Sequence, residues 1–363
     1  MENMGIKQFS DSYRNRSILV TGHTGFKGSW LVYWLQTLGA KVSGISLDFC
    51  TQPSHWESLN SDISDHRCDI RNFDQLQVLV AAIKPEIIFH LAAQPLVRCS
   101  YDDPLESWST NVMGTANLLE ASRHCDSVRA IVAITTDKVY SNREWHWGYR
   151  ENDRLGGRDP YSASKSACEI LIDSYRQSFF KQESTPLLAS ARAGNVIGGG
   201  DWSADRLVPD IVRAVTSGNP IEIRSPHATR PWQHVLECLA GYLLLGEKML
   251  TGEQCFADAW NFGPDADCNR SVETVVEMMR RHWPAIKWYL SKTTHPHEAN
   301  LLYLDSSKAR SQLDWRPIWN LEQAVNMTIE WYRLFYSDGK IMTAHQLDLY
   351  IQHALASNCS WVN

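Results

Sequence analysis

The segment TTDKVY, residues 135–140, sets an acid beside a base where a buried strand should end. Asp137 and Lys138 follow Thr136 directly after the apolar run VRAIVAI at 128–134. Such a run is typical of a parallel strand covered on both faces, and charged groups near an interior are costly unless they are solvated or paired. An adjacent acid and base can protonate a leaving group and remove a proton. The plainer alternative is a solvated charge pair worth about 0–1 kcal/mol.

A second chemical signal is the turn VTGHTGFKG at 20–28, where Gly22, Gly25 and Gly28 follow an apolar strand and open a helix. Glycines at this spacing let the backbone turn sharply, approach a pyrophosphate without a Cβ in the way, and pack the helix on the strand. Asp48, which ends the next apolar strand, can accept hydrogen bonds from an adenosine ribose and would repel a 2′-phosphate. The pattern predicts NAD rather than NADP, and the alternative is a glycine-rich turn near an unrelated surface Asp.

The third signal is YSASK, which places Tyr161 and Lys165 four residues apart on one face of the helix that Pro160 is expected to open. A phenol with a pKa near 10 is a poor base at neutral pH. A nearby ammonium group and the positive ring of NAD both favour the phenolate, which brings the tyrosine toward the range of a general base. Tyr and Lys also meet at this spacing by chance, so the motif alone has a substantial false-positive rate.

Short β-branched runs alternate with amphipathic stretches over the first half of the chain. Strands are predicted at 17–22, 41–46, 66–70, 86–93 and 128–135, and helices from about Phe26, at 73–83 and at 109–122. This rhythm indicates an α/β fold with a doubly wound, Rossmann-type parallel sheet. After 187–202 the strands shorten (220–226, 259–264) and Gly and Pro become frequent, which favours a smaller α/β lobe that completes a cleft. We expect an NAD-binding domain at 1–194 and a mainly substrate-binding lobe at 195–363, with crossings between them.

In a doubly wound sheet the carboxyl ends of the strands face the ligand. Asp69 and Ile70, and likewise Ala92 and Ala93, end two of the strands and are expected to line adenine and ribose, although plain strand-end packing fits them equally. The residues expected at the cofactor are Gly22, His23, Thr24, Gly25, Phe26, Lys27, Gly28, Asp48, Asp69, Ile70, Leu91, Ala92, Ala93, Gln94, Asn111, Thr135, Tyr161 and Lys165.

Composition narrows the class of protein. The 363 residues carry a net charge of −6 and are 44% hydrophobic and 21% charged, which is typical of a globular chain. No Lys/Arg-rich block occurs, so nucleic acid is not an expected partner. The first sixteen residues lack an apolar leader core and no window reaches about 18 apolar residues, so we expect a cytoplasmic protein without membrane attachment. Nine cysteines without C-x-x-C or His/Cys pairing argue against a metal site.

The glycine turn, HLAAQ at 90–94, TTDKVY and YSASK occur in this order, and together they resemble the extended short-chain dehydrogenase/reductase superfamily of nucleotide-sugar enzymes. Later segments resemble the 4,6-dehydratases within it: GYRENDRLGGRDPYSASK (148–165), ARAGNVIGGGDW (191–202), DRLVPD (205–210), ATRPWQHV (228–235) and HPHEA (295–299). The resemblance covers nearly the whole chain. It implies an NAD-dependent enzyme that removes water from a nucleotide hexose.

By this resemblance Thr136 would bind the sugar 4-hydroxyl, Asp137 would protonate the departing 6-hydroxyl, and Lys138 would take the C5 proton. Tyr161 would take the proton of the 4-hydroxyl while a hydride leaves C4, and the same hydride would return to C6. The chemistry agrees, because hydroxide is a poor leaving group and the C5 hydrogen becomes acidic only beside a C4 ketone. The resemblance also places six residues at the substrate, with Arg230 as a fork for the diphosphate: Asn195, Asp201, Trp202, Arg206, Arg230 and His234.

Two alternatives remain open. A nucleotide-sugar 4-epimerase would share the fold and the pair Tyr161 and Lys165 but would not need an acid and a base at 137–138. A non-catalytic NAD-responsive binding protein would be expected to lack one member of that pair, and this chain has both. Whichever applies, the stretches at about 105–122 and 161–180 are expected to pack against their symmetry mates in a homodimer.

Overall fold

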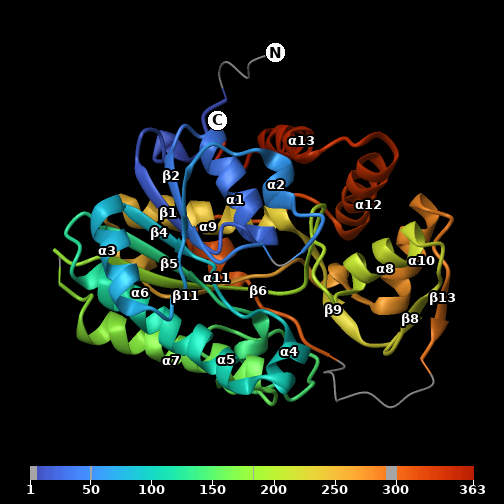
Figure 1. Cartoon of the computed structure of the whole chain (residues 1–363), viewed down its shortest axis with the longest axis horizontal. Helices are drawn as coiled ribbons and strands as arrows, with labels where there is room; N and C mark the ends of the chain where they lie inside the picture. Colours follow the sequence, from blue (N-terminus) through green and yellow to red (C-terminus); the bar gives the residue numbers. More distant parts are fainter. Residues whose placement is uncertain (1–5, 50, 183, 292–300) are drawn as a thin grey trace.

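The computed structural model describes residues 6–49, 51–182, 184–291 and 301–363, so the motif at 295–299 lies outside the described residues. Seven parallel strands form the central sheet: β1 (Ser17–Thr21), β2 (Lys41–Ser46), β3 (Ser64–Arg67), β4 (Ile87–His90), β5 (Ala130–Ile134), β6 (Leu187–Ala193) and β11 (Ala259–Phe262). Their order is β11-β6-β5-β4-β1-β2-β3 (Figure 1). The chain order reverses between β1 and β4, which is the ligand-binding switch point of a doubly wound sheet.

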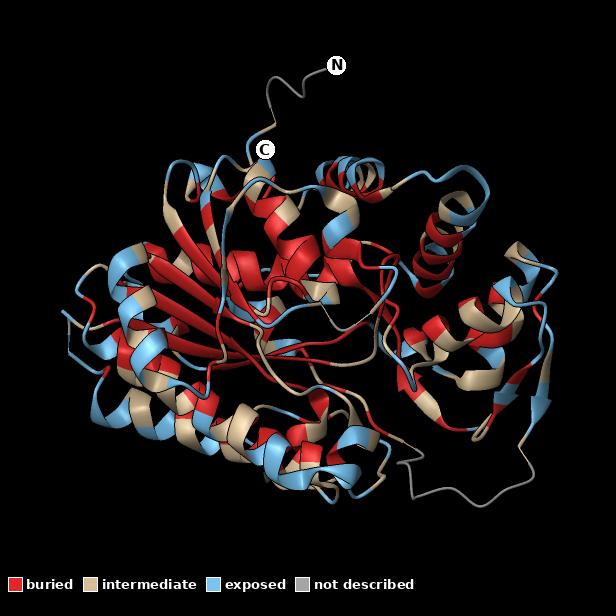
Figure 2. Cartoon of the chain, in the orientation of Figure 1, coloured by how far each residue is buried: buried red, intermediate tan, exposed pale blue. Residues whose placement is uncertain are grey.

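Helices cover both faces of the sheet because the side chains of each strand alternate between them. Ile18 and Val20 of β1 pack into one core, and Leu19 packs into the other. The first core also contains α1 (Phe26–Thr37) and α9 (Val235–Leu250). The second contains α3 (Phe73–Ile83), α6 (Gly114–Arg123) and α7 (Pro160–Ser178). Figure 2 shows the buried strands between these two layers.

A smaller lobe lies to the right of the sheet in Figure 1. It contains α8 (Leu207–Thr216), α10 (Val272–His282) and the strand pairs β8 (Ile221–Ile223) with β13 (Trp288–Leu290) and β9 (Thr229–Pro231) with β12 (Asn269–Ser271). The remaining elements are η1 (Phe9–Asp11), α2 (His55–Leu59), α4 (Val97–Asp102), α5 (Pro104–Trp108), η2 (Ser109–Met113), η3 (Asp137–Val139), β7 (Val196–Ile197), β10 (Gln233–His234), η4 (Gln254–Phe256), η5 (Ala266–Cys268), α11 (Ser307–Gln312), α12 (Leu321–Asp338) and α13 (Thr343–Ala356). Within the described residues, no helix combines the length and the apolarity needed to cross a membrane.

The fold confirms the doubly wound sheet and differs from the sequence expectation in two details. Strand β3 ends at Arg67, so Asp69 and Ile70 lie on the loop after it rather than within it. The run at 259–264, expected in the smaller lobe, supplies the edge strand β11 of the main sheet, where Trp260 is in register with Ala191 of β6. All four residues of β11 are buried, which suits a strand covered on both faces. The domain boundary at 194 stays a prediction.

Glu237 on α9 is a buried carboxylate that ties three segments together. It accepts hydrogen bonds from the N–H groups of Ile318 (2.9 Å) and Trp319 (2.8 Å) and from the hydroxyl of Tyr350 (2.8 Å). Burial raises the pKa of Glu237 from 4.5 to about 7, although these hydrogen bonds oppose the rise. The folded state therefore binds more protons than the unfolded state between these two values, and the free energy of unfolding should fall as pH rises through this window.

Replacing Glu237 by Gln is expected to destabilise the protein by about 1–3 kcal/mol at neutral pH, because the amide NH₂ would face a buried donor. The fall in stability between pH 4.5 and about 7 should also flatten, since the variant has no carboxyl to titrate. Thermal unfolding across this window measures both effects. An unchanged pH slope in the variant would mean that another group carries it.

Candidate active site

A cleft of about 1430 Å³ opens at the carboxyl ends of the strands and extends to the smaller lobe. The predicted site residues that line it are Gly22, Thr24, Gly25, Phe26, Lys27, Gly28, Asp48, Asp69, Ile70, Leu91, Ala92, Ala93, Thr135, Thr136, Asp137, Lys138, Tyr161, Lys165, Asn195, Asp201, Trp202, Arg206 and Arg230. The structure thus brings the three chemical signals of the sequence into one cleft. Trp202 donates its indole N–H to the hydroxyl of Tyr336 (3.0 Å). The backbone carbonyl of Asn195 accepts the N–H of Gln233 (3.0 Å).

The glycine turn is shaped by contacts that leave no space for a Cβ. Gly22 has a φ of +74°, and a Cβ there would lie 2.7 Å from the nitrogen of Ala92. A Cβ on Gly28 would lie 2.1 Å from the oxygen of Gly22. Gly25 is exposed and begins α1 without a side-chain cap. The first N–H groups of α1 therefore face an open part of the cleft, and this cradle fits a pyrophosphate.

Asp48 lies on the loop after β2, and its exposed carboxylate pairs with Arg67 (Oδ1–Nε 3.2 Å). Arg67 also pairs with Asp65 (Nη2–Oδ2 2.9 Å) and donates to the carbonyl of Leu47 (3.0 Å). A guanidinium group is thus present beside the expected ribose position. The carboxylate of Asp48 offsets its attraction for a phosphate.

Replacing Asp48 by Ser is expected to shift the affinity ratio toward NADP by about 10–100-fold, because a charged hydrogen bond from Arg67 to the 2′-phosphate becomes available and the repulsion is removed. Calorimetric titration with each dinucleotide measures the ratio. The double variant Asp48→Ser/Arg67→Met is the control and should lose most of the gain. A ratio that stays at the wild-type value would remove Asp48 from cofactor selection.

The first turns of α7 hold the Tyr–Lys pair. Asp159 caps the helix by accepting a hydrogen bond from the N–H of Ser162 (2.9 Å), and Pro160 occupies the first helical position. Tyr161 and Lys165 then follow on one face, and both are buried. The sequence motif therefore places its two chemical groups on a rigid element.

Burial shifts the pKa of both groups in the direction of the uncharged form. It raises the pKa of Tyr161 to about 12, although a hydrogen bond with Thr136 and the charge of Arg206 act in the opposite direction. It lowers the pKa of Lys165, whose Nζ donates to the carbonyl oxygen of Ile134 at the end of β5 (3.2 Å). A positive group bound next to Tyr161 would favour the phenolate further.

The acid and base of TTDKVY lie on η3, the turn that directly follows β5. Thr136 donates a hydrogen bond to Asp137 Oδ1 (3.0 Å) and accepts one from the N–H of Lys138 (3.3 Å). Asp137 is buried, and its Oδ2 atom has no hydrogen-bond partner among the described residues. Such an oxygen is costly to bury, and a hydroxyl bound in the cleft would satisfy it. Lys138 is half-buried.

Arginines and carboxylates both line the part of the cleft within the smaller lobe. Arg206 pairs with the buried Asp201 (2.9 Å), and Arg230 lies on β9. Sequence reasoning missed four further arginines that line the cleft: Arg98, Arg158, Arg213 and Arg224. Arg158 lies in the segment 148–165, whereas the other three belong to no motif. The spacing of seven residues brings Arg213 of α8 to the side of Arg206, the residue at the N-cap of that helix. Several guanidinium groups together suit a diphosphate.

Two predicted site residues, His23 and His234, do not line the cleft, so their contacts with cofactor and substrate stay predictions. The ring of His23 is fully enclosed, and its Nε2 lies 2.9 Å from Asp65 Oδ1. The ring of His234 is also fully enclosed, packs against Trp319, and caps α9 by accepting the N–H of Leu236 (3.4 Å). Their positions within motifs reflect packing beneath the cleft.

Gln94 and Asn111 do not line the cleft either, and their assignment as cofactor contacts stays a prediction. Asn111 accepts the N–H of Gln94 (2.8 Å) and donates to the hydroxyl of Ser164 on α7 (2.9 Å). Gln94 donates to the hydroxyl of Ser107 (2.9 Å). Both side chains therefore join the loop after β4 to its neighbouring helices.

A Rossmann-type sheet, with a Tyr–Lys pair on a helix whose lysine reaches the end of β5, is typical of the extended short-chain dehydrogenase/reductase class. Within this class, the chain belongs to the GDP-mannose 4,6 dehydratase family, whose model matches residues 19–328.

A curated relative supports this family, and two solved structures share the fold. The chain is 48% identical over 328 residues to the CDP-glucose 4,6-dehydratase of Salmonella typhimurium, covering 88% of this chain and 91% of the relative. A UDP-glucose 4-epimerase of Thermotoga maritima, solved with UDP-glucose, is similar in fold, with a TM-score of 0.77, 22% identity, and coverage of 88% and 99%. A UDP-glucuronic acid 4-epimerase variant of Bacillus cereus, solved with NAD and a UDP-sugar, has a TM-score of 0.75, 25% identity and the same coverage.

Proposed function

We propose that the protein is an NAD-dependent hydro-lyase that converts CDP-D-glucose into CDP-4-keto-6-deoxy-D-glucose. The observation that carries the proposal is the position of Asp137 and Lys138 in the same cleft as Tyr161 and Lys165. An epimerase needs only the second pair, so the first pair favours dehydration. The 48% identical relative supports the choice of CDP-glucose.

NAD, when bound, supplies the hydride acceptor for C4 and the hydride donor for C6. The open N-terminus of α1 at Gly25 would hold its pyrophosphate, and Asp48 would accept hydrogen bonds from its ribose. The close contacts of Gly22 and Gly28 described above keep this cradle free of side chains.

The protein residues then move three protons. Tyr161 takes the proton of the 4-hydroxyl, and the charge of Lys165 favours the phenolate that this requires. Lys138, in its uncharged form, takes the C5 proton once the C4 ketone has made it acidic, and it returns a proton to C5 when the hydride is added to C6. Asp137 delivers a proton to the departing 6-hydroxyl through the oxygen that has no partner among the described residues.

The arginines of the cleft would hold the diphosphate. Arg206 and Arg230 were expected there from the sequence, and Arg98, Arg213 and Arg224 line the same region. A guanidinium group binds two phosphate oxygens at once through parallel hydrogen bonds. A diphosphate held in this way would orient the hexose toward Tyr161. The preference for cytidine rests on the relative alone, and a role in deoxysugar biosynthesis, as for an O-antigen, together with a cytoplasmic location, stays a prediction.

A panel of CDP-, UDP-, dTDP- and GDP-hexoses tests the substrate. We expect a 4-keto-6-deoxy product from CDP-glucose, detected by loss of one water in mass spectrometry. A product of unchanged mass with inverted C4 would identify an epimerase instead. Substrate deuterated at C4 should give product deuterated at C6, whereas loss of the label to solvent would contradict a hydride that is returned within one sugar.

The enzyme is also proposed to be a homodimer. Four apolar side chains on α5, η2 and α7 are exposed, namely Leu105 (78%), Trp108 (41%), Met113 (56%) and Ile170 (61%). Exposed apolar groups that gather on one face favour association. Light scattering at micromolar concentration should give twice the chain mass, and Met113→Asp/Ile170→Glu should give the mass of one chain. A wild-type monomer would contradict the proposal.

A further inference from the structure

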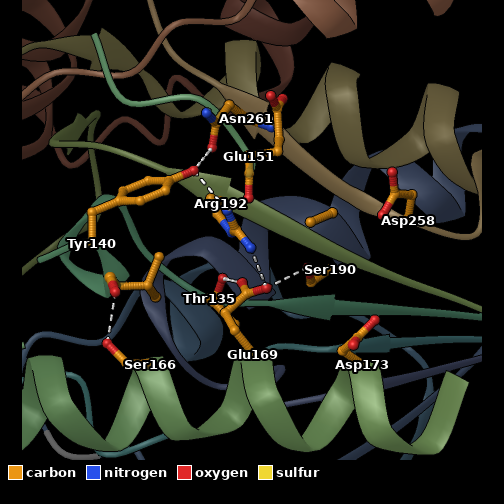
Figure 3. Close-up of polar contacts among 12 residues, drawn as sticks. Thr135, Tyr140, Glu151, Ser166, Glu169, Asp173, Ser190, Arg192, Asp258 and Asn261 are labelled. Carbon is orange, nitrogen blue, oxygen red and sulfur yellow. Dashed lines mark hydrogen bonds and ion pairs between the residues drawn. The ribbon is translucent and has the colours of Figure 1, made fainter. Parts of the chain in front are cut away.

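An ion pair between Glu169 on α7 and Arg192 on β6 is buried beneath the cleft (Figure 3). The Arg192 Nη2–Glu169 Oε2 distance is 2.7 Å, and both side chains are 3% exposed. Neither residue lines the cleft. The pair therefore touches no substrate or cofactor, and whatever it does for the reaction acts through other residues.

The glutamate end of the pair holds the start of the TTDKVY segment. The hydroxyl of Thr135, the residue before the catalytic turn, donates to Glu169 Oε1. Ser190 donates to the other carboxylate oxygen (2.7 Å). Thr135, Ser190 and Arg192 thus supply donors to both oxygens of the carboxylate. Burial alone would raise the pKa of Glu169, but the charge of Arg192 and these hydrogen bonds lower it below its usual value.

The arginine end holds the other end of the same segment. Arg192 Nη1 donates to the hydroxyl of Tyr140 (2.6 Å), and its guanidinium carbon lies 5.1 Å from the centre of that ring. The Tyr140 hydroxyl donates onward to Asn261 of β11 (2.8 Å). A further tie comes from Ser166 of α7, which donates to the carbonyl of Val139 (2.7 Å).

The same helix carries the Tyr–Lys pair. Glu169 follows Lys165 by four residues and Tyr161 by eight, so the three lie on one face of α7. The catalytic turn at 136–138 is thus fastened at both ends to an ion pair whose glutamate is fixed to the helix of Tyr161. A small displacement of the turn or of α7 would therefore be transmitted to the other through these contacts.

Stability alone does not account for such a pair. Replacement of a buried ion pair by packed apolar side chains is often neutral or stabilising, because two charges no longer have to be desolvated. What an apolar core does not reproduce is a set of directional hydrogen bonds to Thr135 and Tyr140. The value of the pair therefore lies in the geometry that it imposes.

We propose that the Glu169–Arg192 ion pair is the positioning element that fixes Asp137 and Lys138 relative to Tyr161 and Lys165, so that elimination follows oxidation on one bound sugar. The inference rests on the proposed function, since it requires two separate chemical steps in one cleft. Both members are positioning residues.

The test uses Glu169→Leu/Arg192→Met, which keeps the interior filled but removes the directional contacts. We expect elimination to slow about 100-fold, the cost of a misplacement of about 1 Å, while oxidation at C4 changes by less than about threefold. Rapid mixing with CDP-glucose should then show reduced cofactor accumulating, and exchange of the C5 hydrogen with deuterated solvent should slow. Arg192→Lys, which keeps the charge but replaces the rigid planar fork of donors by one compact ammonium group, should give an intermediate effect.

Two measurements separate positioning from general damage. Amide hydrogen exchange, followed by mass spectrometry, should rise in peptides covering 135–140 and stay unchanged in the sheet strands. Glu237→Gln, a buried carboxylate change away from the cleft, should lower the unfolding temperature while slowing neither step selectively.

Equal slowing of both steps, or unchanged exchange at 135–140, would overturn the inference. Wild-type protein that forms no 4-keto-6-deoxy sugar from any hexose of the panel would overturn the proposed function instead. In that case the amide exchange of the double variant still decides whether the ion pair holds the segment.

Discussion

Replacing Tyr161 by Phe is expected to slow oxidation at C4, and with it kcat, by about 10²–10⁴-fold, the usual contribution of a general base. No other residue is proposed to take the proton of the 4-hydroxyl. Because burial raises the pKa of Tyr161 to about 12, only a small fraction is phenolate at neutral pH. The oxidation rate of the wild type should therefore rise with pH toward the tyrosine pKa of the loaded enzyme, and the variant should lack this rise.

Stopped-flow absorbance of the reduced nicotinamide measures the step directly. Asp137→Asn is the matched control, since it leaves Tyr161 and Lys165 in place: it should still accumulate reduced cofactor on mixing with substrate but slow the loss of water. If Tyr161→Phe accumulated reduced cofactor at the wild-type rate, another group would be the base for the 4-hydroxyl.

Replacing Lys138 by Ala should leave oxidation intact and reduce exchange of the C5 hydrogen by about 10²–10⁴-fold, because the proposed base for that proton is gone. Lys138→Met should behave in the same way, since it keeps the length of the side chain without the amine. Lys138→Glu supplies a different base at the same position and should retain measurable exchange. Exchange of the C5 hydrogen with deuterated solvent, followed against pH, measures all three.

Unchanged exchange in Lys138→Ala would exclude Lys138 as the base. The role would then pass to Asp137, to a bound water or to Tyr161. Combining Lys138→Ala with Asp137→Asn separates these possibilities, because loss of exchange only in the double variant would identify Asp137.

The sequence was sufficient for the elements that bring the chemistry together. The strands that end at Thr21 and Ile134 have apolar runs typical of a parallel sheet. The motifs follow at the carboxyl ends of these strands, where open α/β sheets bind their ligands. Tyr161 and Lys165 were predictable as neighbours because a helix fixes the spacing of four residues.

Contacts that depend on tertiary packing were not predictable. His23 lies between two glycines of the motif, yet its ring turns beneath β2, where Gly44 has no side chain to exclude it. Arg98 and Arg224 meet near Asp205 (3.1 and 3.7 Å) although they are far apart in the chain. The positioning role proposed for Glu169 was likewise not predictable from the sequence, because it depends on the partner Arg192 on β6.

The edge strand β11 affects how the polypeptide folds while it is being translated. A chain made from its N-terminus completes β6 about seventy residues before β11 emerges, so the growing sheet presents an open edge of unpaired N–H and C=O groups during that interval. Open parallel edges recruit strands from other chains. Aggregation therefore competes with folding while residues 194–262 are being translated. Helix α9 is made just before β11, so it can cover the apolar face of the sheet before the edge of β6 is paired.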